Sequence, residues 1–339
     1  MSESMIKLSD YVLQRVAREG VRHVFLVPGG AAMHLNDSLA GRSDVSFIAN
    51  YHEHACAVAA EAYAKLTGNV GVALVTAGPG STNCLTGLTS AWVNSTPVLF
   101  LSGQVKRSDL KGERPLRQFG LQEVDIVSIV RSVTKYAITV TEPASIRRHM
   151  DLAFYHARHG RPGPVWLDLP LDVQSSQLDS ETLAAADIPA SSAVADPVLV
   201  HAVRRLIEDL SRAERPLLLL GAGIRIAGAA DLAVELIDRL RVPFATTWIS
   251  TDLVDDQHPC FAGRPGAFAS RGANFAVQNS DLLLSIGARW DFATTGFSHH
   301  GFARAARRVV VDVDPAELDK LRAVAECCIH ADARVFLAE

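Results

Sequence analysis

The strongest constraint on the fold is a series of short, continuously apolar runs separated by segments of helical periodicity. In the first half of the chain these runs are HVFLV (23–27), GVALVT (71–76), PVLFLSG (97–103) and GPVWLDLP (163–170). Continuous rather than alternating hydrophobicity is typical of strands buried on both faces, as in a parallel sheet covered by helices. The pattern therefore predicts an α/β domain.

A second series of the same kind follows. It comprises RPLLLLGAG (215–223), VPFATT (242–247), DLLLSIGAR (281–289) and RVVVDVDP (308–315), with a helix expected over about 228–240. Between 173 and 196 the large apolar residues give way to Ser, Asp and Ala, a composition typical of a linker. We expect two doubly wound parallel-sheet domains, at 1–173 and 197–339, joined by a linker over 174–196.

Helix ends are marked by residues with a known local role. Ser9 is expected to be the N-cap of the first helix and Gly20 its stop. A further helix is expected to begin near Glu53 and to end at Gly68. Serine hydroxyls accept from free N–H groups at helix starts, and glycine adopts the left-handed conformation that commonly ends a helix.

Composition excludes several classes of partner. The formal net charge is -4 with 33 basic residues spread along the chain, which argues against nucleic-acid binding. No stretch approaches the roughly 20 apolar residues of a membrane helix, and the start lacks a signal-peptide core. The five cysteines have no metal-ligand spacing, so no metal-binding residues are expected. We expect a cytoplasmic protein that acts on small molecules.

Two glycine-rich turns each follow a predicted strand and precede a predicted helix: VPGGAAMHLND (27–37) and TAGPGSTN (76–83). Each alone fits a tight connection as well as a ligand loop. Glu53, in the sequence HEH, also lies at a strand-to-helix junction, where the helix dipole alone would favour a carboxylate. HEH lacks the spacing of a zinc-binding HExxH motif. The carboxyl ends of parallel strands share one edge, so the three features together favour a ligand site there.

The order of these motifs resembles a known family. VRHVFLVPGGAAMHLND, HEHACAVAAEAYAKLTGNVGVALVTAGPGSTN, SGQV, LQEVDIV and GRPGPVWLDLPLDV are similar to the pyrimidine-binding domain of thiamine-diphosphate enzymes. The likeness is strongest to the acetolactate synthase large subunit and its relatives in nucleotide-sugar and surface-polysaccharide pathways. The second half resembles the central domain of the same family, which carries FAD in acetolactate synthases.

The resemblance implies roles for individual residues in the first domain. Glu53 matches the glutamate that hydrogen-bonds the aminopyrimidine ring and activates the cofactor, in a cleft shared with a second subunit. Gln122 matches a glutamine near the substrate, and Leu121 replaces the phenylalanine that precedes it in the family. The other residues implied to contact thiamine diphosphate are Pro28, Gly29, Gly30, Thr76, Gly78, Pro79 and Asn83.

FAD contacts are implied for a second set. Arginine matches a diphosphate through its fork of donors, and an aspartate after a strand suits a ribose or adenine edge. The GAG at 221–223 is an incomplete dinucleotide fingerprint and is weak alone. The residues implied to contact FAD are Arg161, Gly221, Gly223, Gly263, Arg289, Asp291, Asp312 and Asp314.

The resemblance implies a carboligase that decarboxylates a 2-oxo acid such as pyruvate and transfers the acyl-anion equivalent to a second carbonyl. It also implies a homodimer or homotetramer. Two departures bear on this: PLD (170–172) replaces the proline-lysine-aspartate of acetolactate synthases, and no Gly-Asp-Gly motif for Mg²⁺ and the diphosphate occurs. A separate chain or missing domain is expected to supply that motif. A simple 2-oxo acid decarboxylase and a non-catalytic subunit or remnant remain alternatives.

Overall fold

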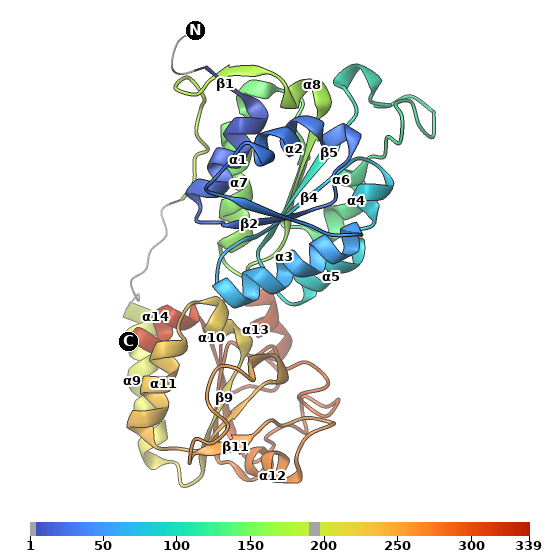
Figure 1. The fold of residues 1–339 in the computed structure, drawn as a ribbon. Helices are drawn as coiled ribbons and strands as arrows, with labels where there is room; N and C mark the ends of the chain where they lie inside the picture. The colour runs from blue at the N-terminus through green and yellow to red at the C-terminus, as the bar shows by residue number, and fades with distance from the viewer. Residues whose placement is uncertain (1–4, 190–196) are drawn as a thin grey trace. The chain divides into compact units, whose positions relative to one another are not determined.

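Both apolar series form parallel sheets flanked by helices, which confirms the predicted α/β class. The computed structural model describes residues 5–189 and 197–339. The chain divides into two units, 1–190 and 191–339, and each is described by itself (Figure 1).

The first unit contains a six-stranded parallel sheet in the order β3-β2-β4-β5-β7-β6, and a small antiparallel pair, β1 with β8. Its strands are β1 (Met5–Lys7), β2 (His23–Leu26), β3 (Ser46–Ala49), β4 (Gly71–Val75), β5 (Val98–Gln104), β6 (Tyr136–Thr139), β7 (Val165–Pro170) and β8 (Gln177–Asp179). The predicted runs form the four strands β2, β4, β5 and β7.

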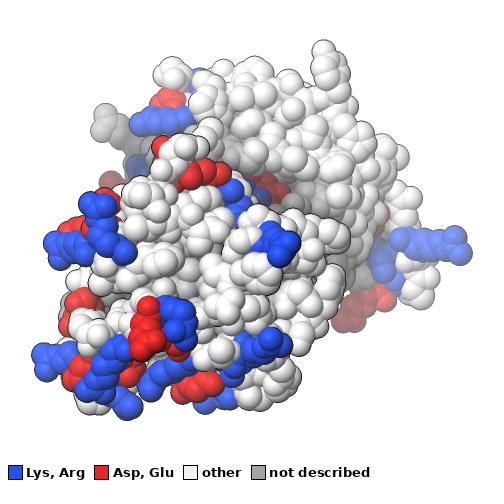
Figure 2. All heavy atoms as spheres, turned by 90° about the horizontal axis from the view of Figure 1, so that it is seen from below, with Lys and Arg blue, Asp and Glu red and all other residues white. Residues whose placement is uncertain are grey.

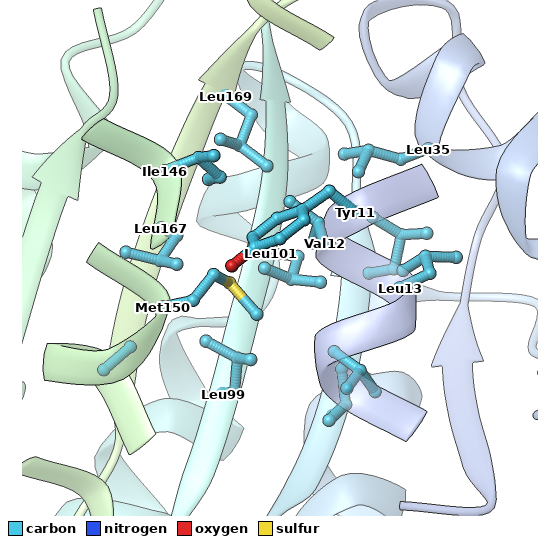
Figure 3. Close-up of a cluster of buried hydrophobic side chains, with 14 of the residues drawn as sticks. Tyr11, Val12, Leu13, Leu35, Leu99, Leu101, Ile146, Met150, Leu167 and Leu169 are labelled. Atoms are coloured by element: carbon cyan, nitrogen blue, oxygen red, sulfur yellow. The ribbon is translucent and has the colours of Figure 1, made fainter. Parts of the chain in front are cut away.

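Helices cover both faces of this sheet. They are α1 (Leu8–Arg18), α2 (Met33–Ala40), α3 (Glu53–Thr67), α4 (Pro79–Thr82), α5 (Leu85–Val93), α6 (Ile126–Val130), α7 (Ile146–Arg158) and α8 (Leu171–Gln174). Alternate residues of β5 belong to different cores: Leu99 and Leu101 pack with α1, α2 and α7, whereas Val98 and Phe100 pack with α3, α5 and α6. Figure 3 shows the first of these cores, with Tyr11, Met150 and Leu101 directed toward one another. Burial on both faces explains why these strands are continuously apolar.

One helix-end prediction is confirmed and another is partly wrong. Helix α3 begins at Glu53, and Gly68 caps its end in the left-handed conformation with φ of 68°. Helix α1 has Lys7 as its N-cap, so Ser9 lies inside the helix. The Ser9 hydroxyl is buried and accepts a hydrogen bond from Ser38 Oγ at 2.8 Å, which makes it a contact between helices rather than a cap.

The expected linker starts too early. Strand β8 pairs with β1, and Leu178 and Leu183 are buried in the first core. Residues 174–183 are thus part of the first unit, because their few apolar side chains fill its core. The final part of the expected linker, residues 190–196, lies outside the described residues.

The second unit contains a six-stranded parallel sheet in the order β11-β10-β9-β12-β13-β14. Its strands are β9 (Pro216–Leu220), β10 (Phe244–Thr246), β11 (Phe261–Gly263), β12 (Leu282–Ile286), β13 (Arg307–Asp312) and β14 (Cys327–His330). Its helices are α9 (Pro197–Arg212), α10 (Ala222–Ile226), α11 (Ala230–Leu240), α12 (Arg271–Asn279), α13 (Pro315–Leu321) and α14 (Ala333–Ala338).

Two cores again lie on the two faces of the second sheet. Helices α9, α10, α11 and α14 cover one face, and α12 and α13 cover the other.

Lys and Arg side chains are interspersed with Asp and Glu on the face seen in Figure 2, rather than gathered in a patch of one sign. Within residues 5–189 and 197–339, no helix is both long and apolar enough to cross a bilayer.

Candidate functional site

The first sheet changes winding direction between β2 and β4. The chain leaves β2 for β3 on one side and then returns to β4 on the other side of β2. The loops that follow β2 and β4 therefore begin at neighbouring strand ends. Open α/β sheets bind ligands at the carboxyl edge where the winding changes in this way. The two predicted glycine turns, after β2 and after β4, are these loops.

Glu53 lies at this edge, in the first turn of α3, shortly after β3. The His52 ring caps the helix by accepting a hydrogen bond from His54 N at 3.1 Å, so the flanking histidines serve the helix start. The Glu53 side chain is half-buried, and its Oε2 accepts a hydrogen bond from Asn83 Nδ2 at 2.9 Å. A carboxylate here is stabilised by the positive end of the helix dipole.

Thr76 joins the two glycine turns. A Cβ atom built on Gly29 would lie 2.4 Å from Thr76 Cβ, and the Ala31 amide donates to Thr76 Oγ1 at 3.2 Å. Built on Gly80, a Cβ would lie 2.6 Å from Thr76 Cγ2 and 3.3 Å from Glu53 Oε1. The glycines thus permit a backbone approach that side chains would block. Glu53 Oε1 therefore lies next to Gly80 of the second turn.

Gln122 reaches this edge through its backbone. A Cβ built on Gly78, whose φ is +62°, would lie 2.2 Å from the Gln122 carbonyl oxygen. Gln122 itself has φ of +57° and is exposed, as is Leu121. Pro28, Gly30 and Pro79 are exposed at the same edge.

Two cysteines line the buried side of Glu53. The Cys84 thiol lies 3.6 Å from the Glu53 carbonyl oxygen, and Cys56 follows in the same helix. Burial raises the pKa of the Cys56 thiol to about 11 and raises the pKa of Cys84 further. Both thiols are therefore protonated at neutral pH and make poor nucleophiles. Within the described parts of the chain, no three His, Cys, Asp or Glu side chains form a cluster able to hold a metal ion.

Arg161 lies elsewhere in the first unit. It precedes β7, so it is at the amino edge of the sheet, opposite the edge that carries Glu53. Its Nε donates to Ser95 Oγ at 2.8 Å, and its carbonyl accepts from Lys135 Nζ at 2.7 Å. The structure does not bring Arg161 together with the other predicted residues of this unit.

The second sheet repeats the change of winding, between β9 and β12. Gly221 and Gly223 follow β9, and Gly287 follows β12. A Cβ built on Gly221 would lie 2.0 Å from the Gly287 carbonyl oxygen, and one built on Gly223 would lie 2.7 Å from Gly287 Cα. These glycines are thus required by the packing of one loop on the other.

The remaining predicted residues of this unit lie along the same carboxyl edge, and several have internal partners. Arg289 Nε forms an ion pair with Glu317 Oε1 at 3.3 Å. Asp291 Oδ2 accepts from Thr294 Oγ1 at 2.8 Å. Its pKa is lowered: burial acts to raise it, and hydrogen bonds from Thr294 outweigh that effect.

Asp312 Oδ1 accepts from the Asp314 amide at 2.9 Å, and Asp314 caps α13 by accepting from the Ala316 amide at 2.9 Å. Both aspartates therefore already shape the turn that follows β13.

Gly263, the remaining predicted residue of this unit, lies at the end of β11 and has φ of +104°.

Two carboxylates beside the first site were not among the predicted residues. Glu123 follows Gln122 directly, and Asp168 lies within β7. Asp168 carried a signal, because a single carboxylate inside a continuously apolar strand is unusual and requires a partner. Glu123 carried none, since its partners are backbone amides that no sequence pattern marks.

The residues at the first edge fit the pyrimidine part of thiamine diphosphate. The first turn is open at Gly30, where an added Cβ would meet no atom within 4 Å, whereas Gly29, Gly78 and Gly80 are packed against Thr76 or Gln122. At the same edge, Asn83 holds a half-buried carboxylate that can accept a hydrogen bond from a ring nitrogen. At the second edge the three glycines are in contact with one another, so their backbone faces a neighbouring loop rather than free space.

Comparison with protein families matches two parts of the chain. Residues 6–129 match the thiamine pyrophosphate enzyme N-terminal TPP binding domain, and residues 203–339 match the central domain of the same enzymes.

Individual relatives are similar over nearly the whole chain. The probable acetolactate synthase large subunit of Methanocaldococcus jannaschii is 34% identical over 93% of this chain and 52% of its own length. The acetolactate synthase of Arthrospira platensis is 35% identical over 97% and 56%. The acetolactate synthase large subunit of Corynebacterium glutamicum is 36% identical over 93% and 49%. The chain thus spans about half the length of the curated relatives it matches.

Proposed function

Because the chain belongs to the thiamine pyrophosphate enzyme family, of which it contains the N-terminal and central domains, we propose that it is the cofactor-activating part of an acetolactate synthase-type carboligase. The reaction would decarboxylate a 2-oxo acid, with pyruvate as the first candidate, and transfer the acyl-anion equivalent to a second carbonyl. The names of the relatives support this reaction class.

The observation that carries the proposal is the placement of the Glu53 carboxylate. One oxygen is held by Asn83, and the other lies above Gly80 at the edge where the sheet changes winding. Thiamine diphosphate, when bound, supplies a carbon nucleophile that no amino-acid side chain provides. Glu53 would hold a proton between its carboxylate and a ring nitrogen of the pyrimidine, and Asn83 would keep the carboxylate oriented for that hydrogen bond.

Other residues would bind and orient. The backbone at Pro28, Gly29, Gly30, Gly78 and Pro79 would contact the pyrimidine ring. The Gln122 amide, which offers both a donor and an acceptor, would orient the 2-oxo acid. Two phosphate groups require a cation and several donors, so we place the Mg²⁺ and diphosphate contacts on residues outside this sequence.

FAD is proposed as a second, structural cofactor of the second unit. The support is the position of Arg289, Asp291 and Asp312 along one carboxyl edge, where α/β sheets bind nucleotides. An absorbance scan of the purified protein tests this directly, because bound flavin has a visible absorption band. Protein free of flavin after reconstitution with FAD would remove this cofactor from the proposal.

Partners are proposed from the family. We expect two copies of the chain to complete each cofactor site. The relatives named as large subunits support a smaller partner subunit as well. Size-exclusion chromatography with light scattering, with and without thiamine diphosphate, measures the first of these associations.

Product analysis is the experiment that tests the reaction. The chain is combined with the residues that supply the diphosphate contacts, loaded with thiamine diphosphate and Mg²⁺, and incubated with pyruvate, with and without an acceptor ketone or aldehyde. Glu53→Gln and Glu53→Ala are assayed in the same way. We expect a ligated product that depends on the acceptor and is lost in both variants. Release of the free aldehyde regardless of acceptor would identify a decarboxylase instead. Unchanged rates in the variants would refute the role of Glu53.

A further inference from the structure

The segment 105–125, between β5 and α6, carries Leu121 and Gln122. Two buried carboxylates are linked to this segment. Glu123 lies within it and is 8% exposed, and Asp168 of β7 is 1% exposed and reaches it through Gln104. We propose that Glu123 and Asp168 are positioning residues that fix the backbone on both sides of Gln122 and so aim its amide at the substrate. The inference rests on the proposed function, in which Gln122 orients the 2-oxo acid.

Glu123 holds the segment on the amino-terminal side of Gln122. Its Oε2 accepts from the Phe119 amide at 2.9 Å and from the Gly120 amide at 3.2 Å, and its Oε1 accepts from the Lys111 amide. Hydrogen bonds to a charged acceptor are stronger than those between neutral groups. One carboxylate thus closes the stretch from Lys111 to Gly120 into a loop.

Asp168 acts on the other side through Gln104. Gln104 Nε2 donates to Asp168 Oδ2 at 3.1 Å and also to the Val124 carbonyl at 3.0 Å. The Gln104 side chain thereby ties the end of β5 to the residue two positions after Gln122. Its other amide atom, Oε1, accepts from the Val105 amide at 3.0 Å, so the side chain has one orientation.

The environment of Asp168 supports a role beyond packing. Ser102 Oγ donates to its Oδ1 at 2.6 Å, and Thr139 Oγ1 donates to its Oδ2 at 3.0 Å. A buried carboxylate destabilises a core unless several donors surround it. An apolar residue would pack in this strand without such a cost. An apolar residue could not accept the hydrogen bond from Gln104, whose amide also donates to the Val124 carbonyl outside the core.

The backbone of Gln122 is where the two anchors meet. Its φ of +57° is uncommon for a residue with a side chain, and its carbonyl lies against Gly78. Such conformations persist only where surrounding contacts impose them. The anchors at Gly120 and Val124 impose this one, and they leave the Gln122 side chain projecting from a fixed backbone at the edge that carries Glu53.

The first test measures order in the segment without any cofactor. Amide hydrogen exchange is followed in the 339-residue protein for Glu123→Gln, Asp168→Asn and Glu113→Gln, an exposed glutamate of the same segment. We expect exchange about tenfold faster over 111–124 in the first variant, because a charged acceptor of three amides is lost. We expect faster exchange at 122–125 in the second variant and no change in the third.

The second test asks whether Glu123 acts through Gln122. In the same reconstituted, cofactor-loaded enzyme as in the product analysis, kcat/KM for the 2-oxo acid is measured for Glu123→Gln, Gln122→Ala and the double variant. Each single variant is expected to lose about tenfold, and the double variant is expected to match Gln122→Ala, because residues acting through one another are not additive.

Unchanged exchange in Glu123→Gln overturns the positioning role by itself. Additive losses in the double variant show that Glu123 merely stabilises the fold and also overturn it. Full activity in Gln122→Ala shows instead that the proposed function assigned Gln122 wrongly. The exchange data distinguish this failure from a failure of the positioning role of Glu123.

Discussion

The Asn83 side-chain amide donates a hydrogen bond of 2.9 Å to Glu53 Oε2, joining the loop after β4 to the first turn of the helix after β3. The Asn83 amide thereby holds the carboxylate that the family resemblance marks as cofactor-activating.

Asn83→Ala is expected to lower cofactor-dependent activity about tenfold, because a hydrogen bond to a charged group is lost. Glu53→Gln is expected to lower it by about a hundredfold or more, since the amide cannot exchange the proton. Thermal unfolding should change little in Asn83→Ala, because this residue is exposed. Equal activity of Asn83→Ala and wild type would show that Glu53 is oriented by other groups.

Gly78→Ala is expected to disrupt the site and to destabilise the first unit by about 1–3 kcal/mol, since a side chain is strained at positive φ and its Cβ would collide with the Gln122 carbonyl. Gly30→Ala is the matched control, as a Cβ there meets no atom within 4 Å. Urea unfolding of both variants provides the comparison. Similar midpoints for the two would mean that the loop adjusts freely.

Asp168 predicts a pH dependence of stability. Burial raises the pKa of its carboxyl to about 6, although Ser102, Gln104 and Thr139 donate hydrogen bonds that act to lower it. Because the folded-state pKa exceeds that of the unfolded chain, the folded state binds the proton more tightly. Protonated Asp168 therefore adds about 3 kcal/mol to the free energy of unfolding, for a pKa shift of about two units. This stabilisation is fully present below about pH 4 and is lost as the pH rises through about 6.

The measurement is urea unfolding of wild type and Asp168→Asn between pH 4 and pH 7.5. The difference between their unfolding free energies isolates the Asp168 contribution from other titrating groups. We expect wild type to lose stability relative to the variant as the pH rises. A difference that stays constant over this range would contradict the raised pKa.

Gly221→Ala is expected to destabilise the second unit and to reduce any flavin content, because its Cβ would lie 2.0 Å from a backbone oxygen of Gly287. Gly272→Ala is the control: this glycine lies in α12 with nothing within 4 Å of an added Cβ, and alanine is the better helix former. Calorimetry resolves the effect if the two units unfold separately.

Leu121→Phe restores the aromatic residue that the family resemblance implies at this position. Leu121 is 85% exposed, so the substitution should change the unfolding free energy by less than about 0.5 kcal/mol. We expect a changed preference among acceptor carbonyls with little change in the rate of 2-oxo acid decarboxylation. Product ratios from competing acceptors, one small and one bulky, measure the change.

The central strands of both sheets could be predicted because burial on two faces makes them continuously apolar. The edge strands could not. All four residues of β3 are exposed, and β11 has three residues, so neither produces an apolar run. The carboxyl-edge placement of Glu53 and the two glycine turns also followed from chain order alone. The contacts of Glu123 and Asp168 did not, since they join side chains to backbone groups or to strands distant in sequence.

At Gln122, the contacts that fix the position of the main chain are separate from the side chain that a ligand would meet at the neighbouring residue 121. Hydrogen bonds and the Gly78 turn determine where the main chain lies, and none of them uses the Leu121 side chain. Residue 121 is therefore free to vary without a cost in folding. A saturation library at this single position should retain folded protein in most of its members, so the side chain beside Gln122 can change without any compensating substitution elsewhere.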